Sequence, residues 1–287
     1  MATLQNTAAQ NAGTSEILLE VDSLRTEFAT DDGVVAAVAG VSFGVPRGRT
    51  VALVGESGSG KSVTGYSILR LVQPPGRIAG GRIRLHSARL GEIDITALRE
   101  NDPLLYKLRG GLVSMIFQEP MTALSPVHSV GAQICESILL HQERDKSAAR
   151  AQAVAMMEKV GIPEAARRFD HYPHELSGGM RQRIVIAMAL VCRPELLIAD
   201  EPTTALDVTI QAQVLGLIRA LQREIGCSVL MVTHDFGVVA QMADDVVVMK
   251  HGRIVEQGPV RTVLKNPQHA YTRALLDALP SRRHHAT

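Results

Sequence analysis

The chain has 287 residues, of which 46% are hydrophobic and 21% are charged. This balance is typical of a globular protein with one large α/β domain or two small ones. Its formal net charge is +1 and only 3% of its residues are aromatic, which argues against a positive field over the whole molecule and against ring platforms for nucleic acid. The three cysteines, Cys135, Cys192 and Cys227, are far apart, so we expect free thiols rather than a metal or iron–sulfur site.

The two sequence features that would mark a secreted or membrane-spanning chain are missing. Residues 1–15 are polar and lack the basic start and apolar run of a signal peptide, so we expect a disordered tail there. The longest apolar run, Ile184 to Cys192, falls well short of the about 20 residues that cross a bilayer. Any membrane role is therefore expected to come from a partner.

The N-terminal third reads as an antiparallel sheet. From Ile17 to Val45, short apolar–polar segments alternate around a turn at Asp31-Asp32-Gly33, which predicts a β-hairpin. Later, Gly80-Gly81 indicates a loop, and the following residues 82–85 read as an edge strand.

A glycine-rich loop comes between these segments, with the sequence Gly55-Glu56-Ser57-Gly58-Ser59-Gly60-Lys61-Ser62. It fits the phosphate-binding pattern G-x-x-x-x-G-K-[ST] at every fixed position. An apolar strand (residues 50–54) precedes it and a helical pattern from Val63 follows it, a context that a mere Gly/Ser turn would not need. Its backbone N–H groups can form an anion nest at a helix N-terminus. Lys61 can then reach the β- and γ-phosphates, and Ser62 can bind Mg²⁺.

Three further apolar strands each end in a polar residue. The strand at 112–117 ends at Gln118, the strand at 196–199 ends at Asp200-Glu201, and the strand at 228–233 ends at His234. Continuous apolar strands that alternate with helices predict a parallel sheet covered on both faces. Ligands of such sheets lie outside the carboxyl ends of the strands, so we expect these residues to meet the glycine-rich loop at one edge.

These strand-end residues suit nucleotide hydrolysis. Asp200 offers the carboxylate oxygen that Mg²⁺ prefers, and Glu201 could act as general base towards water. Gln118 could bind Mg²⁺ or orient water, and His234 could contact the γ-phosphate. Each has a plainer alternative: an acidic turn, a solvated loop glutamine or a structural histidine.

A second candidate anion site follows a long helical region. Residues 130 to 168 have a helical pattern interrupted at 161–163, and Leu176-Ser177-Gly178-Gly179 then leads into a helix from Met180 to about Val191. A hydroxyl and two glycines at a helix N-terminus can bind an anion. The alternative is a simple helix-capping turn.

These motifs follow one order along the chain: the phosphate loop, Gln118, this Ser-Gly-Gly segment, Asp200-Glu201, Asp207 and His234. This order resembles that of the ATP-binding cassette (ABC) family, from about residue 17 to 280. The resemblance implies a P-loop NTPase cassette of the α/β class, with a mostly parallel core sheet, an N-terminal antiparallel β subdomain and an inserted helical subdomain. It implies a nucleotide-binding domain over residues 16–258, a helical subdomain at about 119–187 and a C-terminal extension over 259–287.

The resemblance also implies a site shared by two cassettes that bind ATP and Mg²⁺ between them. Ser177, Gly178 and Gly179 would serve the γ-phosphate of the partner, and Asp207 would lie at the dimer seam. Val63 would contact the nucleotide, and Phe28 would stack on adenine, although a core-facing Phe28 is the alternative.

Three segments resemble the oligopeptide, dipeptide and nickel importers within this family. They are residues 118–126, 172–175 and 266–276. The last differs from the usual pattern in having Ala270 where proline is common. The cysteine-rich tail of that subfamily is not found before Thr287, so no iron–sulfur cluster is expected, and His284 and His285 are interpreted as tail residues.

The resemblance therefore implies an ATPase that powers peptide import by closure of a cassette dimer, with motion transmitted through residues 119–142. The implied partners are two membrane-spanning permease subunits, a second ATPase subunit (a paralogous heterodimer rather than a homodimer) and, indirectly, an extracytoplasmic solute-binding protein. The implied location is the cytoplasmic face of the bacterial inner membrane. Alternatives are import of nickel or another small solute, and a non-transport ABC ATPase acting on nucleic acid. A P-loop kinase would not explain the Ser-Gly-Gly segment.

Overall fold

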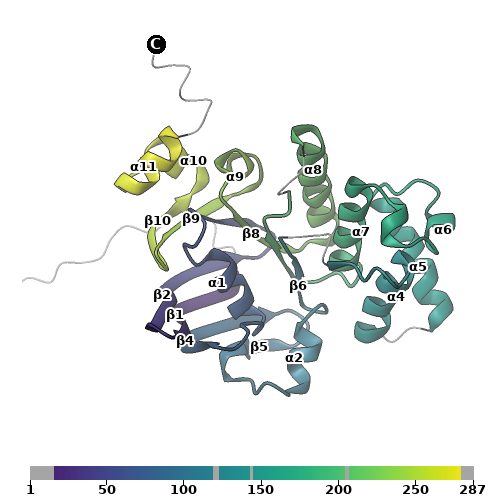
Figure 1. Cartoon of the computed structure of the whole chain (residues 1–287), viewed down its shortest axis with the longest axis horizontal. Helices are drawn as coiled ribbons and strands as arrows, with labels where there is room; N and C mark the ends of the chain where they lie inside the picture. The colour runs from purple at the N-terminus through teal and green to yellow at the C-terminus, as the bar shows by residue number, and fades with distance from the viewer. Residues whose placement is uncertain (1–15, 119–122, 143–144, 204–206, 279–287) are drawn as a thin grey trace, which may run out of the picture.

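The computed structural model describes residues 16–118, 123–142, 145–203 and 207–278. They form two sheets with helices around them and a helical lobe to one side (Figure 1). The expected disordered tail over residues 1–15 lies outside the described residues.

The first sheet is antiparallel, with strand order β2-β1-β4-β5. β1 (Ile17–Thr30) and β2 (Gly33–Pro46) form the predicted hairpin around Asp31 and Asp32. β4 (Gly76–Ser87) and β5 (Gly91–Asp94) complete it.

The expected loop at Gly80-Gly81 is wrong, and residues 82–85 form a strand as expected, although β4 is not at the edge of the sheet. β4 runs through this point and pairs with β1 on one side and β5 on the other. The register with β1 shifts here, and a Cβ on Gly81 would lie 2.5 Å from the carbonyl oxygen of Ser23. The glycine therefore allows a close strand approach at a β-bulge, which looks like a loop signal in the sequence.

The second sheet has the order β10-β9-β3-β8-β7-β6. Its five parallel strands are buried, as their continuous apolar sequences predict. Only β10 runs antiparallel, at one edge. The bounds are β3 Thr50–Val54, β6 Val113–Ile116, β7 Leu196–Asp200, β8 Ser228–Thr233, β9 Asp245–Lys250 and β10 Arg253–Pro259.

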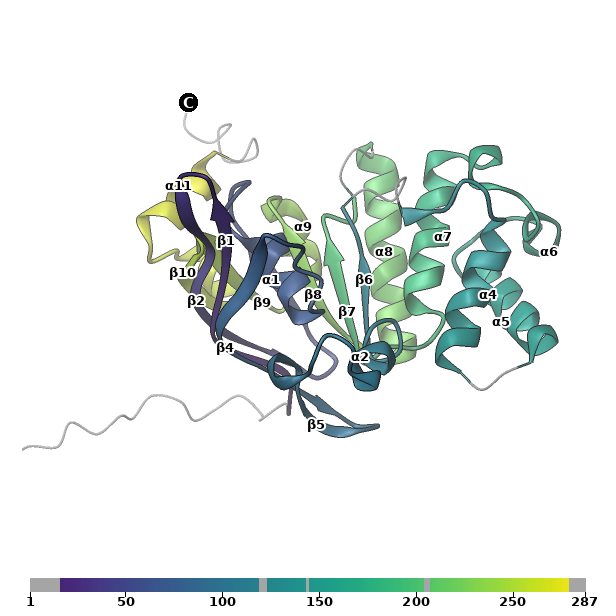
Figure 2. The same ribbon diagram turned by 60° about the horizontal axis from the view of Figure 1, so that its bottom comes forward.

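Helices cover this sheet and build the lobe beyond β6 (Figures 1 and 2). α7 begins at Gly178, two residues before the predicted start, because the Ser177 hydroxyl oxygen accepts the N–H of Met180 and caps the helix. The helical region at 130–168 is divided into α4, α5 and α6. The helices are α1 Lys61–Ile68, α2 Pro103–Leu108, α4 Val130–His141, α5 Lys146–Lys159, α6 Ala165–Arg168, α7 Gly178–Leu190, α8 Val208–Ile225, α9 Phe236–Met242, α10 Val260–Lys265 and α11 Ala270–Asp277, with short 3-10 turns at Ile95–Ala97 and Pro173–Glu175.

Three apolar cores hold these layers together. One joins the helical lobe to β6, β7 and β8, a second lies between the antiparallel sheet and α1, and a third packs α9, α10 and α11 against β3 and β9. Across the described ranges, no helix combines the length and apolar character needed to cross a membrane. Cys135, Cys192 and Cys227 are free thiols, as expected.

Candidate nucleotide site

The phosphate loop joins β3 to α1 and is fixed by glycines that have no room for a side chain. A Cβ on Gly55, at φ +153°, would lie 2.2 Å from the carbonyl oxygen of Met249, and one on Gly60 would lie 2.2 Å from that of Ala37. Both positions have the left-handed backbone that favours glycine. The loop is thus held between the end of β9 and strand β2, with its helix N-terminus open to an anion.

Lys61 is the first residue of α1 and is folded back onto the loop. Its Nζ donates to the carbonyl oxygens of Gly55 and Glu56, both at 2.8 Å, and lies 3.4 Å from the hydroxyl of Ser59. Burial lowers its pKa, while the negative charges of Glu201 and Asp200 act in the opposite direction. The ammonium group therefore has neutral loop carbonyls as its partners and is already positioned for phosphate oxygens.

Ser62 and Asp200 meet beside the loop. The Ser62 hydroxyl donates to Oδ1 of Asp200 at 3.0 Å. The other carboxylate oxygen, Oδ2, is buried without a hydrogen-bond partner among the described residues. Burial raises the pKa of Asp200 to about 6, against the bond from Ser62. A buried carboxylate oxygen without a partner, next to a hydroxyl, fits a hard divalent cation.

The ends of three strands converge at Glu201. His234, after β8, has its Nδ1 2.9 Å from Oε1 of Glu201, and Gln118, after β6, donates from Nε2 to Oε2 at 3.4 Å. Glu201 itself has φ +46° at the end of β7. The structure therefore brings together the strand-end residues that the sequence placed at one edge.

The segment Ser177-Gly178-Gly179 is not brought to this site. In both views β6 lies between α1 and α7 (Figures 1 and 2). Ser177 and Gly178 are exposed. Asp207 is also exposed and caps α8, accepting the N–H of Ile210 at 2.9 Å. The two residues before it, Ala205 and Leu206, lie outside the described residues.

Phe28 and Val63 share an apolar pocket of about 500 Å³ next to α1. Phe28 is half-buried, and its ring would crowd a Cβ on Gly76. The ring thus packs against Gly76 and also lines the pocket. The pocket is lined by Phe28, Val63, Tyr66, Leu71, Val72, Gln73 and Phe117.

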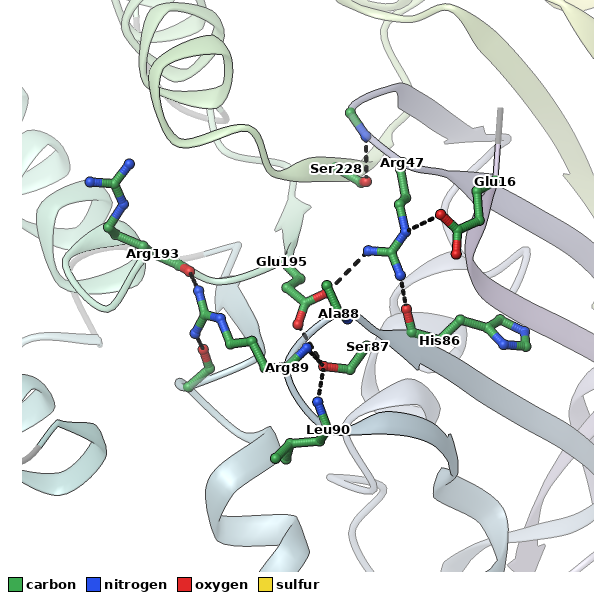
Figure 3. Close-up of polar contacts among 12 residues, drawn as sticks. Glu16, Arg47, His86, Ser87, Ala88, Arg89, Leu90, Arg193, Glu195 and Ser228 are labelled. Atoms are coloured by element: carbon green, nitrogen blue, oxygen red, sulfur yellow. Dashed lines mark hydrogen bonds and ion pairs between the residues drawn. The ribbon is translucent and has the colours of Figure 1, made fainter. Parts of the chain in front are cut away.

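A half-buried carboxylate ties the antiparallel sheet to the site strand β7 (Figure 3). Glu195 precedes β7 and accepts from the Ser87 hydroxyl at 2.6 Å, the Ala88 N–H at 2.8 Å and Nη1 of Arg47 at 3.2 Å. Burial raises its pKa, but these bonds outweigh it and leave the pKa below its usual value. Glu195 was not among the predicted residues, because its partners are far away in the sequence.

Two further contacts of the site were missed by sequence reasoning. Gln182, fully buried in α7, donates from Nε2 to the carbonyl oxygen of Pro202 at 2.6 Å. Tyr271, in the C-terminal extension, accepts the N–H of Glu56 at 3.1 Å. Gln182 lies between Arg181 and Arg183, before the apolar run, so no local pattern signals its contact. The contact of Tyr271 likewise depends on tertiary packing.

A strand, glycine loop and helix beside a strand that ends in two acids define a P-loop nucleotide-binding fold. Residues 38–204 match the family described as ABC transporter, and residues 255–287 match the family described as oligopeptide/dipeptide transporter, C-terminal region. The chain therefore belongs to the ABC transporter family, and it is an ATP hydrolase coupled to transport.

Relatives and solved structures agree with this assignment. A putative peptide import ATP-binding protein of Brucella melitensis is 52% identical over 264 residues, which cover 92% of this chain and 78% of that protein. The glutathione import ATP-binding protein GsiA of Escherichia coli K12 is 51% identical over 92% of this chain, which spans 42% of GsiA. The ATP-binding cassette MJ0796, a dimer bound to ADP and Pi in a post-hydrolysis state, has a TM-score of 0.73 and 25% identity, with 85% of this chain and 99% of that chain covered.

Proposed function

We propose that this chain supplies the ATP-driven step for import of peptides across a bacterial cytoplasmic membrane. The C-terminal match at residues 255–287 carries this proposal, because it separates oligopeptide and dipeptide transporters from other cassettes. The relatives named for peptide import support it over most of the chain. They favour transport over the alternative of an ATPase that acts on nucleic acid.

We propose that Ser62, Asp200 and Gln118 hold Mg²⁺ next to the phosphate loop. The buried Oδ2 of Asp200 and the adjacent Ser62 hydroxyl are oxygen donors of the kind this ion prefers. When bound, Mg²⁺ supplies charge neutralisation for the phosphate oxygens. Lys61 supplies the other positive charge once it exchanges the loop carbonyls for the β- and γ-phosphates.

Glu201 is proposed as the general base for the attacking water. His234 contacts one of its carboxylate oxygens and Gln118 contacts the other, so the two side chains hold the carboxylate in one orientation. His234 is also proposed to contact the γ-phosphate. Apart from Glu56 and Ser59, whose N–H groups donate to Tyr271 and to the carbonyl oxygen of Glu56, the loop residues from Gly55 to Gly60 present backbone N–H groups to the phosphates. Phe28 and Val63 contact the adenine.

The second half of each nucleotide site is proposed to come from a second cassette. The exposed Ser177 and Gly178, together with the partly buried Gly179, would bind the γ-phosphate of that partner, and Asp207 would lie at the seam. The dimeric state of the MJ0796 cassette supports such pairing. We propose a paralogous heterodimer on the cytoplasmic face of the membrane, attached to two permease subunits and served indirectly by a solute-binding protein. Part of the segment 119–142 proposed to transmit motion lies outside the described residues.

Glutathione is the second candidate solute, because a relative named for glutathione import is 51% identical over 92% of this chain. Nickel is the remaining alternative from the subfamily resemblance. Glutathione is itself a small peptide, so the same ATPase chemistry would serve both peptide solutes.

The test is reconstitution of the chain with the permease pair and binding protein encoded beside it, in vesicles with ATP at the face that carries this chain. We expect uptake of labelled dipeptides or oligopeptides and a solute-stimulated ATPase rate. Glutathione and Ni²⁺ are the parallel arms. Stimulation by Ni²⁺ alone, with no peptide or glutathione uptake, would overturn peptide import, as would salt-sensitive binding of DNA or RNA without any permease association.

A further inference from the structure

The C-terminal extension contacts the phosphate loop through one side chain. Tyr271 lies in α11 and is 8% exposed. Its hydroxyl oxygen accepts the backbone N–H of Glu56, the second residue of the loop, at 3.1 Å. A segment at the far end of the chain thus forms part of the wall of the nucleotide site.

This bond fixes a peptide unit that Lys61 also uses. The N–H of Glu56 and the C=O of Gly55 belong to one planar trans peptide, so they point in opposite directions. Tyr271 accepts the N–H, and Nζ of Lys61 donates to the C=O at 2.8 Å. The two side chains therefore hold the same peptide from opposite sides.

Within the loop, the Lys61 side chain reaches the C=O of this peptide and not its N–H. Gly55 has no Cβ, and its position against Met249 requires that absence. Glycine also gives the backbone its widest choice of angles. An external hydrogen bond is therefore what favours the orientation in which the Gly55 carbonyl faces Lys61.

Tyr271 is itself held rigidly. The N–H groups of Gln268 and His269, just before α11, donate to the carboxylate of Glu256 on β10 at 2.7 and 3.1 Å. The phenol ring packs in the core that contains Val54 and other residues of β3 and β9, and Nζ of Lys250 lies 4.6 Å from the ring centroid. The extension is thus anchored to β10, the edge strand that pairs with β9, before Tyr271 reaches the loop.

We propose that Tyr271 is a positioning residue of the phosphate loop, through which the C-terminal extension sets the affinity for nucleoside di- and triphosphates. Tyr271 keeps the Gly55–Glu56 peptide in place, and that peptide keeps Lys61 where it can move onto the phosphates. This role concerns nucleotide binding and does not depend on which solute is transported.

The test compares Tyr271→Phe with Tyr106→Phe in the full chain. The first variant keeps the ring and removes the hydroxyl, and the second changes a tyrosine on α2 that is 65% exposed. We expect Tyr271→Phe to raise the Kd for MgATP and MgADP about twofold to tenfold, the range for one neutral hydrogen bond. The ATP concentration for half-maximal hydrolysis should rise by the same factor, with kcat unchanged. Tyr106→Phe should leave these values as they are.

A spectroscopic readout separates positioning from packing. The chain has four tyrosines, so labelling with 3-fluorotyrosine gives four ¹⁹F signals, and Tyr271→Phe assigns one of them. That signal should shift on MgATP addition and in Lys61→Ala without nucleotide, while the Tyr106 signal stays. The proposal is overturned if Tyr271→Phe binds both nucleotides like the wild type, or if it lowers only the melting temperature, or if the Tyr271 signal ignores both MgATP and Lys61→Ala.

Discussion

The phosphate loop and the Ser-Gly-Gly segment are both helix N-termini with glycines, yet the chain treats them in opposite ways. Carbonyl oxygens of Met249 and Ala37 crowd Gly55 and Gly60 of the loop, and the side chains of Asp200 and Tyr271 form hydrogen bonds with the loop. At the other end, a Cβ on Gly178 would meet no heavy atom within 4 Å in the described part of the chain.

This difference teaches that the two sites cannot work in the same way. Packing and the bond to Tyr271 hold the loop, from within the same chain, in the shape of an anion nest. The glycine at 178 is not explained by packing within the chain, so its small size is available to something that approaches from outside. A glycine at position 178 that is open to a second molecule is what the proposed pairing of two cassettes requires.

Glu201→Gln gives the largest expected effect and tests the site formed by the phosphate loop, Asp200 and Glu201 (the enclosed site). The amide cannot accept a proton from water, so we expect hydrolysis to fall about 10²–10⁴-fold. Nucleotide affinity should stay near that of the wild type, because Lys61 and the loop are unchanged. Phosphate release and binding of a fluorescent ATP analogue measure the two quantities. Glu158→Gln, an exposed change on α5, is the control, and full turnover in Glu201→Gln would remove Glu201 as the base.

Ser177→Arg tests the Ser177-Gly178-Gly179 segment at the N-terminus of α7 (the open site). The added side chain should block the γ-phosphate position of a partner cassette, with an expected loss in hydrolysis of about 10²–10³-fold, the scale for removing a key donor to a reacting oxyanion. The Kd for ATP of the isolated chain should not change. Ser147→Arg, also exposed and on α5, is the matched control. Loss of ATP binding by the isolated Ser177→Arg chain would contradict a site completed by a partner.

Much of the enclosed site could be predicted from the sequence because its signals are local. The loop pattern, the acids after an apolar strand and the Asp-Gly hairpin each need only neighbouring residues. Even the meeting of Gln118, Glu201 and His234 follows from strand ends in a parallel sheet. The fold class was therefore correct before any contact was known.

The rest depended on contacts between distant residues. Gly80-Gly81 has the composition of a loop, but pairing with the distant strand β1 turns it into a bulge within β4. Glu195 and Tyr271 carry no local pattern, and their roles appear only when the antiparallel sheet and α11 pack on the core. Ala270, unusual beside the subfamily pattern, simply begins α11, where a good helix former is tolerated.

Phe28→Ala tests the proposed contact between the Phe28 ring and the adenine of the nucleotide. If Phe28 stacks on adenine, its loss should weaken ATP and ADP alike by roughly tenfold, as stacking on one base is worth about 1–3 kcal/mol. Phe28→Tyr should retain the affinity, because it keeps the ring. Competition between ATP and inorganic triphosphate distinguishes the two ends of the ligand. An affinity for inorganic triphosphate that falls as much as that for ATP would indicate that Phe28 only packs against Gly76.

The smallest expected effect compares two aspartates, Asp200 in the enclosed site and Asp207 at the open end, in the nucleotide-free chain. Burial raises the pKa of Asp200 to about 6 from an ordinary value of 3.8. The ionised form is therefore disfavoured in the fold, and this group's contribution to stability is present below pH 4 and is lost as pH rises through 6.

Asp200→Asn should raise the free energy of unfolding by roughly 1–2 kcal/mol at pH 8 and by little at pH 4. Asp207→Asn should change it by less than about 0.5 kcal/mol at either pH, since asparagine caps a helix as well as aspartate does. Urea denaturation at the two pH values measures both variants. Equal effects of the two substitutions at pH 8 would show that Asp200 is not held as an uncompensated buried charge awaiting a cation.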